Sequence, residues 1–420
     1  MSYSGKYFSN LFDHIAAITK AVDLMNPQIA YHHQKVAYVT YFLAEQLALP
    51  IEEKRIVVLA AMLHDVGSLS LHDNLDFEEE KSQDIHVHAF IGADLLKDFY
   101  LLNQVAQVIR FHHVPWKNGE NNIFCGKKVP YLSHLIHLAD RVVVKINQKE
   151  NIITQSKLIR EIVESQAGMV FEPNAAKAFL TVSKTESFWL DLMYEQNFSN
   201  TVEDLALRTL RITLDETVEL TGIFAKIIDF RSPFTARHSA SVSSVAVKLA
   251  ELFGFSENDC KKMRIAGNLH DLGKLAIPRE ILEKQGSLST IEFDIMKSHS
   301  YYSYRLMNMI EGYHEIAEWG AYHHEKLNGR GYPFRLFAES LTLAARIMAV
   351  ADIFTAITED RPYRAGMSRE KTEMILNHMV AQEGISGPVV HMLLEHFDEI
   401  NHVRIRAEER ALFSYGDILL

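Results

Sequence analysis

The sequence repeats itself at a long period, and the repeat keeps histidines and an aspartate in fixed places. The segment LAAMLHDVGSLS around His64 resembles IAGNLHDLGKLA around His270. In each copy another histidine, His32 or His238, lies 32 residues earlier, and the residues between the two histidines align without a gap. The two halves of the chain are therefore expected to share one fold, as copies of a duplicated domain.

Further residues of the kinds that bind metals follow each HD pair in the same order. The copies are offset by 211 residues at three histidines and by 212 at an aspartate: His88, His112, His113 and Asp140 in the first copy, and His299, His323, His324 and Asp352 in the second. The differences in length between the copies fall between expected helices, which supports a true duplication.

Helical periodicity dominates the chain. Apolar residues recur at spacings of three and four in segments such as IAAITKAVDLM, SVSSVAVKLAELF and REKTEMILNHMV, and long alternating strands are hard to find. Ser289 and Glu292 have the spacing of a capping box at the start of a helix that carries His299. These patterns predict an all-α fold.

Composition limits the classes of function. A chain of 420 residues suggests two or three domains, and a net charge of −11 disfavours binding to a nucleic acid polymer. Cys125 and Cys260 form no metal-type pair, which fits a reducing compartment. The N-terminus does not read as a signal peptide, and no apolar run approaches the ~20 residues of a membrane span. We expect a cytoplasmic protein without a membrane segment.

The second copy offers enough ligands for a metal centre. Adjacent helical residues point about 100° apart, so His270 and Asp271 serve one metal only where the backbone is irregular, or they serve two. Asp271 has two oxygens with which to bridge two cations, and cations ~3.5–4 Å apart can ionise a shared water and hold a phosphoryl group. A lone HD dipeptide is weak evidence, because most helical histidines are surface or core residues. Five such segments in order favour a metal site.

The second half resembles the HD-GYP branch of the HD superfamily. Its motifs are HDLGK from His270 to Lys274, KSHSYYSYRLM around His299, HHEKLNGRGYP from His323 to Pro333, and ADIFTAITEDRPYR from Ala351 to Arg364. The resemblance covers about residues 215–415. It implies a metal-dependent phosphodiesterase that cleaves cyclic dinucleotides, chiefly cyclic di-GMP and in a few members 3',3'-cGAMP. The product is the linear dinucleotide, pGpG from cyclic di-GMP, and in some members the mononucleotide GMP.

The resemblance also implies roles for individual residues. One divalent metal would be held by His238, His270, Asp271 and Asp352, and a second by the bridging Asp271 with His299, His323 and His324. The catalytic residues would be Asp271 and Lys274, and the substrate would be bound by Lys274, Tyr332, Arg361 and Arg364. Iron or manganese is favoured, and nickel, zinc and magnesium stay open. Some members place a carboxylate one helical turn before the first histidine, where it helps to bind a third metal. Phe234 stands there, so two metals are expected.

The first half looks like an HD domain without the GYP signature. It keeps the ligand types at seven positions: His32, His64, Asp65, His88, His112, His113 and Asp140. Ser68 stands where the second half has Lys274, and no arginine pair follows Asp140. His33 is expected to be a bystander. Three interpretations stay open: a metal-binding but inactive sensor, an empty pseudo-domain, or a hydrolase with another substrate.

We therefore expect two tandem HD-type helical domains: a degenerate one in residues 1–185, a helical connector in 186–214, and an HD-GYP catalytic domain in 215–420. The leading hypothesis is a cyclic-dinucleotide phosphodiesterase that uses a metal-activated water. The alternatives are a signalling module that binds the dinucleotide with little or no turnover, and an HD nucleotide phosphohydrolase of another substrate class. Metal identity, base preference, the final product and a homodimeric assembly stay open.

Overall fold

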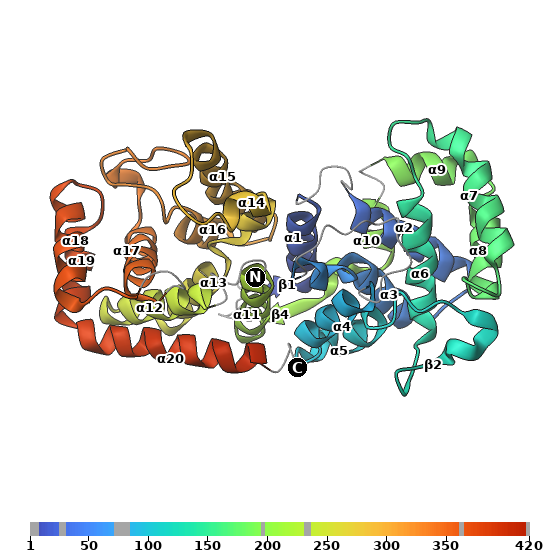
Figure 1. Ribbon diagram of the computed structural model, residues 1–420, viewed down its shortest axis with the longest axis horizontal. Helices are drawn as coiled ribbons and strands as arrows, with labels where there is room; N and C mark the ends of the chain where they lie inside the picture. Colours follow the sequence, from blue (N-terminus) through green and yellow to red (C-terminus); the bar gives the residue numbers. More distant parts are fainter. Residues whose placement is uncertain are drawn as a thin grey trace, which may run out of the picture. The chain divides into compact units, whose positions relative to one another are not determined.

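The computed structural model describes residues 8–24, 31–70, 85–194, 198–230, 237–360 and 365–416. Within these ranges the chain is helical apart from loops and a few short strands, which confirms the all-α prediction (Figure 1). It divides into two compact units. We call Asn26–Leu210 the first unit, and Arg211–Leu420 together with Met1–Met25 the second unit. None of the helices in the described ranges is long and apolar enough to cross a membrane.

The first unit is a helical body with one small hairpin. Its elements are α2 (His32–Gln46), α3 (Ile51–Leu63), η2 (Val66–Ser70), α4 (Ile85–Leu96), η3 (Tyr100–Leu102), α5 (Asn103–Ile109), η4 (Lys117–Asn122), β2 (Ile123–Phe124), β3 (Lys127–Lys128), α6 (Tyr131–Val144), α7 (Ile152–Gln166), α8 (Pro173–Val182), α9 (Glu186–Met193), α10 (Phe198–Asp204) and η6 (Leu207–Thr209). Here η denotes a 3-10 helical turn. The core helix α2 packs against α3, α6 and α8.

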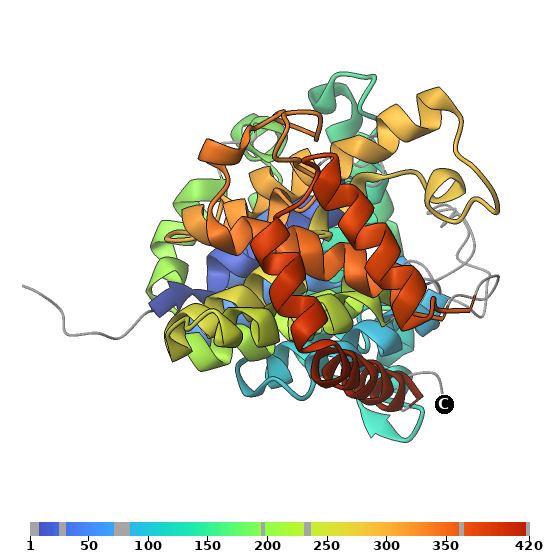
Figure 2. The same ribbon diagram turned by 90° about the vertical axis from the view of Figure 1, so that its left-hand side faces the viewer.

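The second unit has the corresponding core and an additional C-terminal set of helices. Its elements are β1 (Phe8–Asn10), α1 (Leu11–Asp23), β4 (Arg211–Thr213), α11 (Leu214–Phe230), α12 (His238–Leu252), α13 (Glu257–Leu269), η7 (Leu272–Ala276), α14 (Arg279–Leu282), α15 (Thr290–Met307), α16 (His314–Ala321), η8 (Ala338–Ser340), α17 (Leu343–Thr358), α18 (Arg369–Ala381), α19 (Gly387–Glu395) and α20 (Phe397–Gly416). Helix α12 packs against α13, α17 and the long α20 (Figures 1 and 2).

The sequence repeat is a repeat of structure. Helices α2 and α12 have the same length and begin at the matching histidines His32 and His238. Helices α3 and α13 also match in length, and each is followed at the same interval by a 3-10 turn, η2 or η7. The two units therefore build their ligand clusters on equivalent elements.

Side-chain caps set the starts of several helices of the second unit. Ser289 accepts a hydrogen bond from the backbone N–H of Glu292, and the Glu292 side chain accepts one from the backbone N–H of Ser289. This is the reciprocal capping box that the sequence predicts for the helix carrying His299. Ser256 and Thr342 are the N-caps of α13 and α17, and each side chain accepts one hydrogen bond from a backbone N–H of the first helical turn.

The N-terminal helix α1 belongs to the second unit, not to the repeat that follows it in sequence. Strand β1 pairs antiparallel with β4, and α1 packs against η7 and α15. The buried ring of His14 donates from Nδ1 to the Asn10 carbonyl and accepts at Nε2 from the Tyr313 hydroxyl, each at 2.7 Å. The compact units thus differ from the expected boundaries, since periodicity shows that this helix has an apolar face but not which partner covers it.

The expected connector at residues 186–214 is also absorbed into the two units. Helices α9 and α10 and the turn η6 lie in the first unit, and β4 lies in the second. Helix α9 buries Phe188 and Trp189, and Trp189 Nε1 donates to the Ser183 carbonyl at 2.9 Å. Two buried aromatic rings give this segment a packed position in the first unit.

We expect Ile15→Ala to destabilise the second unit, although residue 15 lies far in sequence from the rest of that unit. Ile15 is 0% exposed in α1, and truncating a buried isoleucine to alanine costs about 2–5 kcal/mol. Leu158→Ala is the control, because Leu158 is 61% exposed on α7. Thermal unfolding followed by calorimetry measures both, and an unchanged transition in Ile15→Ala would contradict the placement of α1.

Candidate metal centres

The HD pair of the second unit lies where a helix ends and the backbone becomes irregular. Helix α13 ends at Leu269, His270 is its C-cap, and Asp271 has φ −100° and ψ 11°. The 3-10 turn η7 follows at once and carries Lys274. This break lets two adjacent side chains converge, which a continuous helix would not allow.

A glycine allows the HD turn to lie against the helix that supplies the next histidine. A Cβ built on Gly273 would stand 2.0 Å from the carbonyl oxygen of His299 and 2.7 Å from the backbone nitrogen of Ser303. In the first unit, a Cβ on Gly67 would stand 2.1 Å from the carbonyl oxygen of His88. Only glycine fits this close backbone approach. The glycine three residues after each HD histidine therefore lets the HD turn lie close to the helix that carries the next histidine.

The predicted ligands of the second unit converge around the two oxygens of Asp271. Oδ2 lies 3.1 Å from His270 Nε2, while Oδ1 lies 3.4 Å from His299 Nε2 and 3.9 Å from His323 Nε2. Donor atoms bound tetrahedrally to one ion at ~2.1 Å lie roughly 3.4 Å apart. Each Asp271 oxygen therefore faces a different histidine group, as a bridging ligand requires.

The remaining predicted ligands complete both groups. His238 Nε2 lies 3.0 Å from Asp352 Oδ1, and His238, His270 and Asp352 together place ligand atoms within 4.8 Å of one another. His299, His323 and His324 form a second such group, and His324 Nδ1 lies 4.0 Å from Asp352 Oδ2. The structure thus brings all seven residues into one cluster.

Hydrogen bonds leave inward-facing histidine nitrogens available to a cation. The Nδ1 atoms of three rings donate to carbonyl oxygens one turn earlier at 2.7–2.8 Å: His270 to Gly267, His299 to Met296, and His323 to Gly320. In neutral rings this leaves lone pairs on Nε2, which is the usual arrangement of metal-bound histidine. The buried His270 Nε2 and Asp271 Oδ1 make no hydrogen bond. These residues therefore fit a pair of divalent ions.

The charges of the cluster agree with that interpretation. Burial lowers the pKa of His299 to about 3, so its ring is neutral at pH 7. Burial alone would raise the pKa of the Asp271 carboxyl, but His270 and Lys274 hold it well below its usual range. Burial would lower the pKa of His238, yet Glu359 and Asp352 raise it to about 10. Metal binding at His238 would therefore release a proton.

The structure describes two of the four predicted substrate-binding residues, Lys274 and Tyr332. Lys274 Nζ contacts Asp271 Oδ2 across the 3-10 turn, on the same side as the HD pair. The ring of Tyr332 lies 4.8 Å from the ring of His324, centroid to centroid. Its loop is held by the buried Glu325, which accepts backbone hydrogen bonds from Phe334, Arg335 and Leu336. Arg361, Arg364 and Phe234 lie outside the described residues. The expectation of two rather than three metals rests on Phe234 and stays a prediction.

Two buried carboxylates near the cluster were not anticipated. Glu359 Oε2 accepts from His238 Nδ1 at 3.2 Å. It follows Asp352 by seven residues, and this spacing on one helical face was the available signal. Asp229, at 3% exposure, accepts from Ser239 Oγ at 2.8 Å. Burial, with the negative charge of Asp271 adding to it, raises the pKa of Asp229 to about 7.

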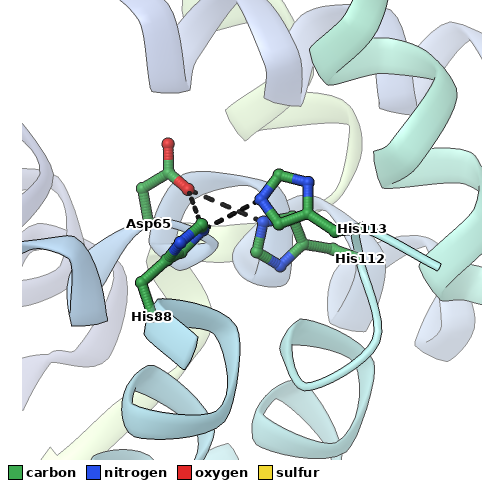
Figure 3. A group of neighbouring side chains, drawn as sticks. All are labelled: Asp65, His88, His112 and His113. Atoms are coloured by element: carbon green, nitrogen blue, oxygen red, sulfur yellow. Dashed lines mark hydrogen bonds and ion pairs between the residues drawn. The ribbon is translucent and has the colours of Figure 1, made fainter. Parts of the chain in front are cut away.

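The first unit builds the same kind of cluster from its own seven ligand-type residues, and Figure 3 shows four of them, Asp65, His88, His112 and His113. All seven are at most 8% exposed: His32, His64, Asp65, His88, His112, His113 and Asp140. Asp65 again divides its oxygens, with Oδ2 at 3.0 Å from His64 Nε2, and Oδ1 at 3.2 Å from His88 Nε2 and 3.6 Å from His112 Nε2. Metal-type geometry is therefore present in both units.

The first unit differs around this cluster. Ser68 occupies the place of Lys274 in the 3-10 turn, and the segment after the histidine pair forms the turn η4 and the hairpin β2–β3, where the second unit has its GYP loop. His33, expected to be a bystander, is buried and groups with His64 and Asp65 within 4.8 Å. His33 lies close to His64 and Asp65 because it follows His32 at the start of α2.

Comparison with known proteins agrees with this duplicated arrangement. Models of the HD domain match residues 29–162 and, by a second variant, residues 222–385. The chain is 27% identical over 405 residues to the 3'3'-cGAMP-specific phosphodiesterase 1 of Vibrio cholerae, covering 94% of each chain. It is 33% identical to the cyclic di-GMP phosphodiesterase response regulator RpfG of Xanthomonas campestris, over 44% of this chain and 48% of that protein.

A solved structure shows the same fold. The cyclic GMP-AMP specific phosphodiesterase V-cGAP3 of V. cholerae superposes with a TM-score of 0.65 at 22% identity, over 94% of this chain and 98% of that one. Together with the two matched domains and the paired histidine–aspartate clusters, this similarity shows that the chain belongs to the HD superfamily and carries two HD domains in tandem.

Proposed function

We propose that this chain is a metal-dependent phosphodiesterase that hydrolyses cyclic dinucleotides at the metal centre of its second unit. The proposal rests on one observation above all: the two oxygens of Asp271 face two separate groups of metal-type ligands, with the ammonium group of Lys274 beside them. A receptor that only binds a dinucleotide needs no such arrangement. The unpaired Cys125 and Cys260 are consistent with action in the cytoplasm.

The proposed ligands are those expected from the resemblance. His238, His270, Asp271 and Asp352 would hold one divalent ion, and Asp271 with His299, His323 and His324 would hold the other. When bound, such a pair of ions supplies Lewis acidity to phosphoryl oxygens and makes a shared water more acidic. Nitrogen and oxygen donors of this kind suit iron or manganese, with nickel and zinc next.

The chain's own residues would bind and orient the substrate. Lys274, held against Asp271, would place a positive charge beside the scissile phosphate. Tyr332, packed on His324, would form one wall of the pocket. Water would add to phosphorus, and the bond from phosphorus to the ribose 3' oxygen would break. That oxygen would take up a proton, which leaves a linear dinucleotide with a 5' phosphate.

The relatives support this substrate class. A relative that aligns along nearly the full chain is named for 3'3'-cGAMP, and others are named for cyclic di-GMP. The test is turnover of both dinucleotides by the full-length protein loaded with Mn²⁺ or Fe²⁺ under anaerobic conditions. We expect a linear dinucleotide from at least one of them. Hydrolysis of dNTPs alone, or dinucleotide binding without turnover, would refute the proposal.

Glu359 is expected to position His238 for its metal. Removing a carboxylate that orients a metal-bound histidine commonly costs about 10–100-fold in metal affinity, so Glu359→Ala should weaken metal binding by that factor. Competition with a chromogenic chelator measures the affinity. Glu373→Ala is the matched control, because Glu373 is exposed on α18. Equal affinities in the two variants would show that Glu359 has no such role.

A further inference from the structure

A largely buried arginine lies against the ligand cluster of the first unit. Arg141 follows Asp140 on α6, and its side chain is 11% exposed. One terminal guanidinium nitrogen lies 3.2 Å from His113 Nδ1 and 3.6 Å from Asp140 Oδ2. The equivalent residue after Asp352 in the second unit is Ile353, which carries no charge. The first unit thus has a positive charge where the second unit has none.

This contact determines which nitrogen of His113 carries the proton. A guanidinium only donates hydrogen bonds, so His113 Nδ1 must accept, and the ring must be neutral with its proton on Nε2. That proton points at His88 Nε2, 2.9 Å away. A protonated ring nitrogen has no lone pair for a metal. His113 could bind a metal through Nε2 only by moving its proton to Nδ1, against the guanidinium.

The second unit lacks this obstacle. His324 Nδ1 and Asp352 Oδ2 face each other at 4.0 Å, and the Nδ1 of His299 is held by the Met296 carbonyl. In the first unit, Arg141 contacts both His113 and Asp140, and the buried Nδ1 of His88 has no hydrogen-bond partner. The ligand atoms of Asp65, His88, His112 and His113 lie within 4.8 Å of one another. Of these residues, His113 is the one whose proton Arg141 places on the nitrogen that faces the cluster.

The other metal position of the first unit is intact. His32 Nε2 lies 3.2 Å from Asp140 Oδ1 and 3.4 Å from His64 Nε2, and His64 Nε2 lies 3.0 Å from Asp65 Oδ2. These spacings match the roughly 3.4 Å between donors around one tetrahedral ion. His64 Nδ1 bonds to the Ala61 carbonyl at 2.8 Å, which leaves Nε2 to face the ion.

We propose that the first unit binds a single divalent transition-metal ion through His32, His64, Asp65 and Asp140, and that the guanidinium of Arg141 replaces the second ion. The nitrogen and oxygen donors suit iron, manganese or zinc. A fixed positive charge beside Asp140 repels a second dication and supplies part of the charge that this dication would bring. The two units of one chain then differ in nuclearity, with one ion in the first and two in the second.

The first test counts metals in the full-length protein reconstituted with Mn²⁺. We expect about three ions per chain in the wild type, about two in Asp65→Ala, and about one in Asp271→Ala. Electron paramagnetic resonance should show the spectrum of an isolated Mn²⁺ together with a coupled pair, and Asp65→Ala should remove only the isolated signal. Loss of two ions or of none in Asp65→Ala would overturn the proposal. The content of Asp271→Ala reports separately on the second unit.

The second test changes Arg141 itself. Arg141→Ile copies the residue of the second unit and should raise the content to about four ions, with the isolated signal replaced by a coupled one. Arg141→Lys keeps the charge and should stay at about three. A folded Arg141→Ile protein that still binds three ions would refute the replacement. Should Arg141→Ile fail to fold, a wild-type content of four ions would refute it as well.

Discussion

Asp271→Ala is expected to abolish hydrolysis and to lower the metal content of the protein by about two ions. The two oxygens of Asp271 face the two ligand groups closely, with Oδ2 at 3.1 Å from His270 Nε2 and Oδ1 at 3.4 Å from His299 Nε2. Removing it would take a ligand from each of the two proposed ions and would leave Lys274 without its ion-pair partner. We expect a fall in kcat of more than about 10³-fold. Turnover assays and elemental analysis measure the two effects.

Asp294→Ala is the matched control for this experiment. Asp294 lies on α15, is 61% exposed, and pairs with Lys297 on the surface. Such exposed pairs contribute little, so the variant should keep full activity and metal content. If Asp271→Ala kept near-normal turnover and metal, the second unit would not be the catalytic site.

Lys274→Ala is expected to keep the metals and lose most of the rate. Lys274 is not among the proposed metal ligands, and its Nζ lies against Asp271 on the 3-10 turn. Burial would lower the pKa of Lys274, but Asp271 holds it above its usual value, so the side chain is positively charged at pH 7. Removing one group that stabilises transition-state charge commonly costs about 10²–10³-fold in kcat. The measurement is kcat with metal content on the same samples.

Lys297→Ala removes a half-buried lysine from α15 and serves as the control for Lys274→Ala. It should leave kcat unchanged. If Lys274→Ala lost metal together with activity, the role of Lys274 would be to support Asp271 rather than to act on the substrate. Unchanged kcat in Lys274→Ala would exclude it from catalysis altogether.

The cluster of the second unit could be recognised in advance because each ligand lies in a short local motif. His270 and Asp271 end one helix, His299 lies on a helix whose capping box is visible in the sequence, and Asp352 lies inside an apolar helical run. Local helix rules and a fixed order of ligands were sufficient to predict one shared site. The structure brings the ligand atoms of each group within 4.8 Å of one another.

Residues that act through other residues could not be recognised in this way. Glu359 belongs to the cluster because α17 ends where its carboxylate meets His238. Arg141 matters because it meets His113, which lies 28 residues earlier in the chain. A glutamate or arginine on an amphipathic helix is usually a solvated side chain, and only its tertiary neighbours distinguish these two from that common case.

The sequence by itself determined the helical class, the duplication and the residue types of both histidine–aspartate clusters, because apolar periodicity and ligand order are local properties that survive in any packing. Tertiary structure alone decided where α1 packs and which hydrogen-bond partners the cluster histidines have. The first depends on which apolar face is nearest in space, and brings residues 8–24 into the second unit. The second depends on which elements meet in space: His112 Nδ1 meets the Ile109 carbonyl, whereas His113 Nδ1 meets the guanidinium of Arg141.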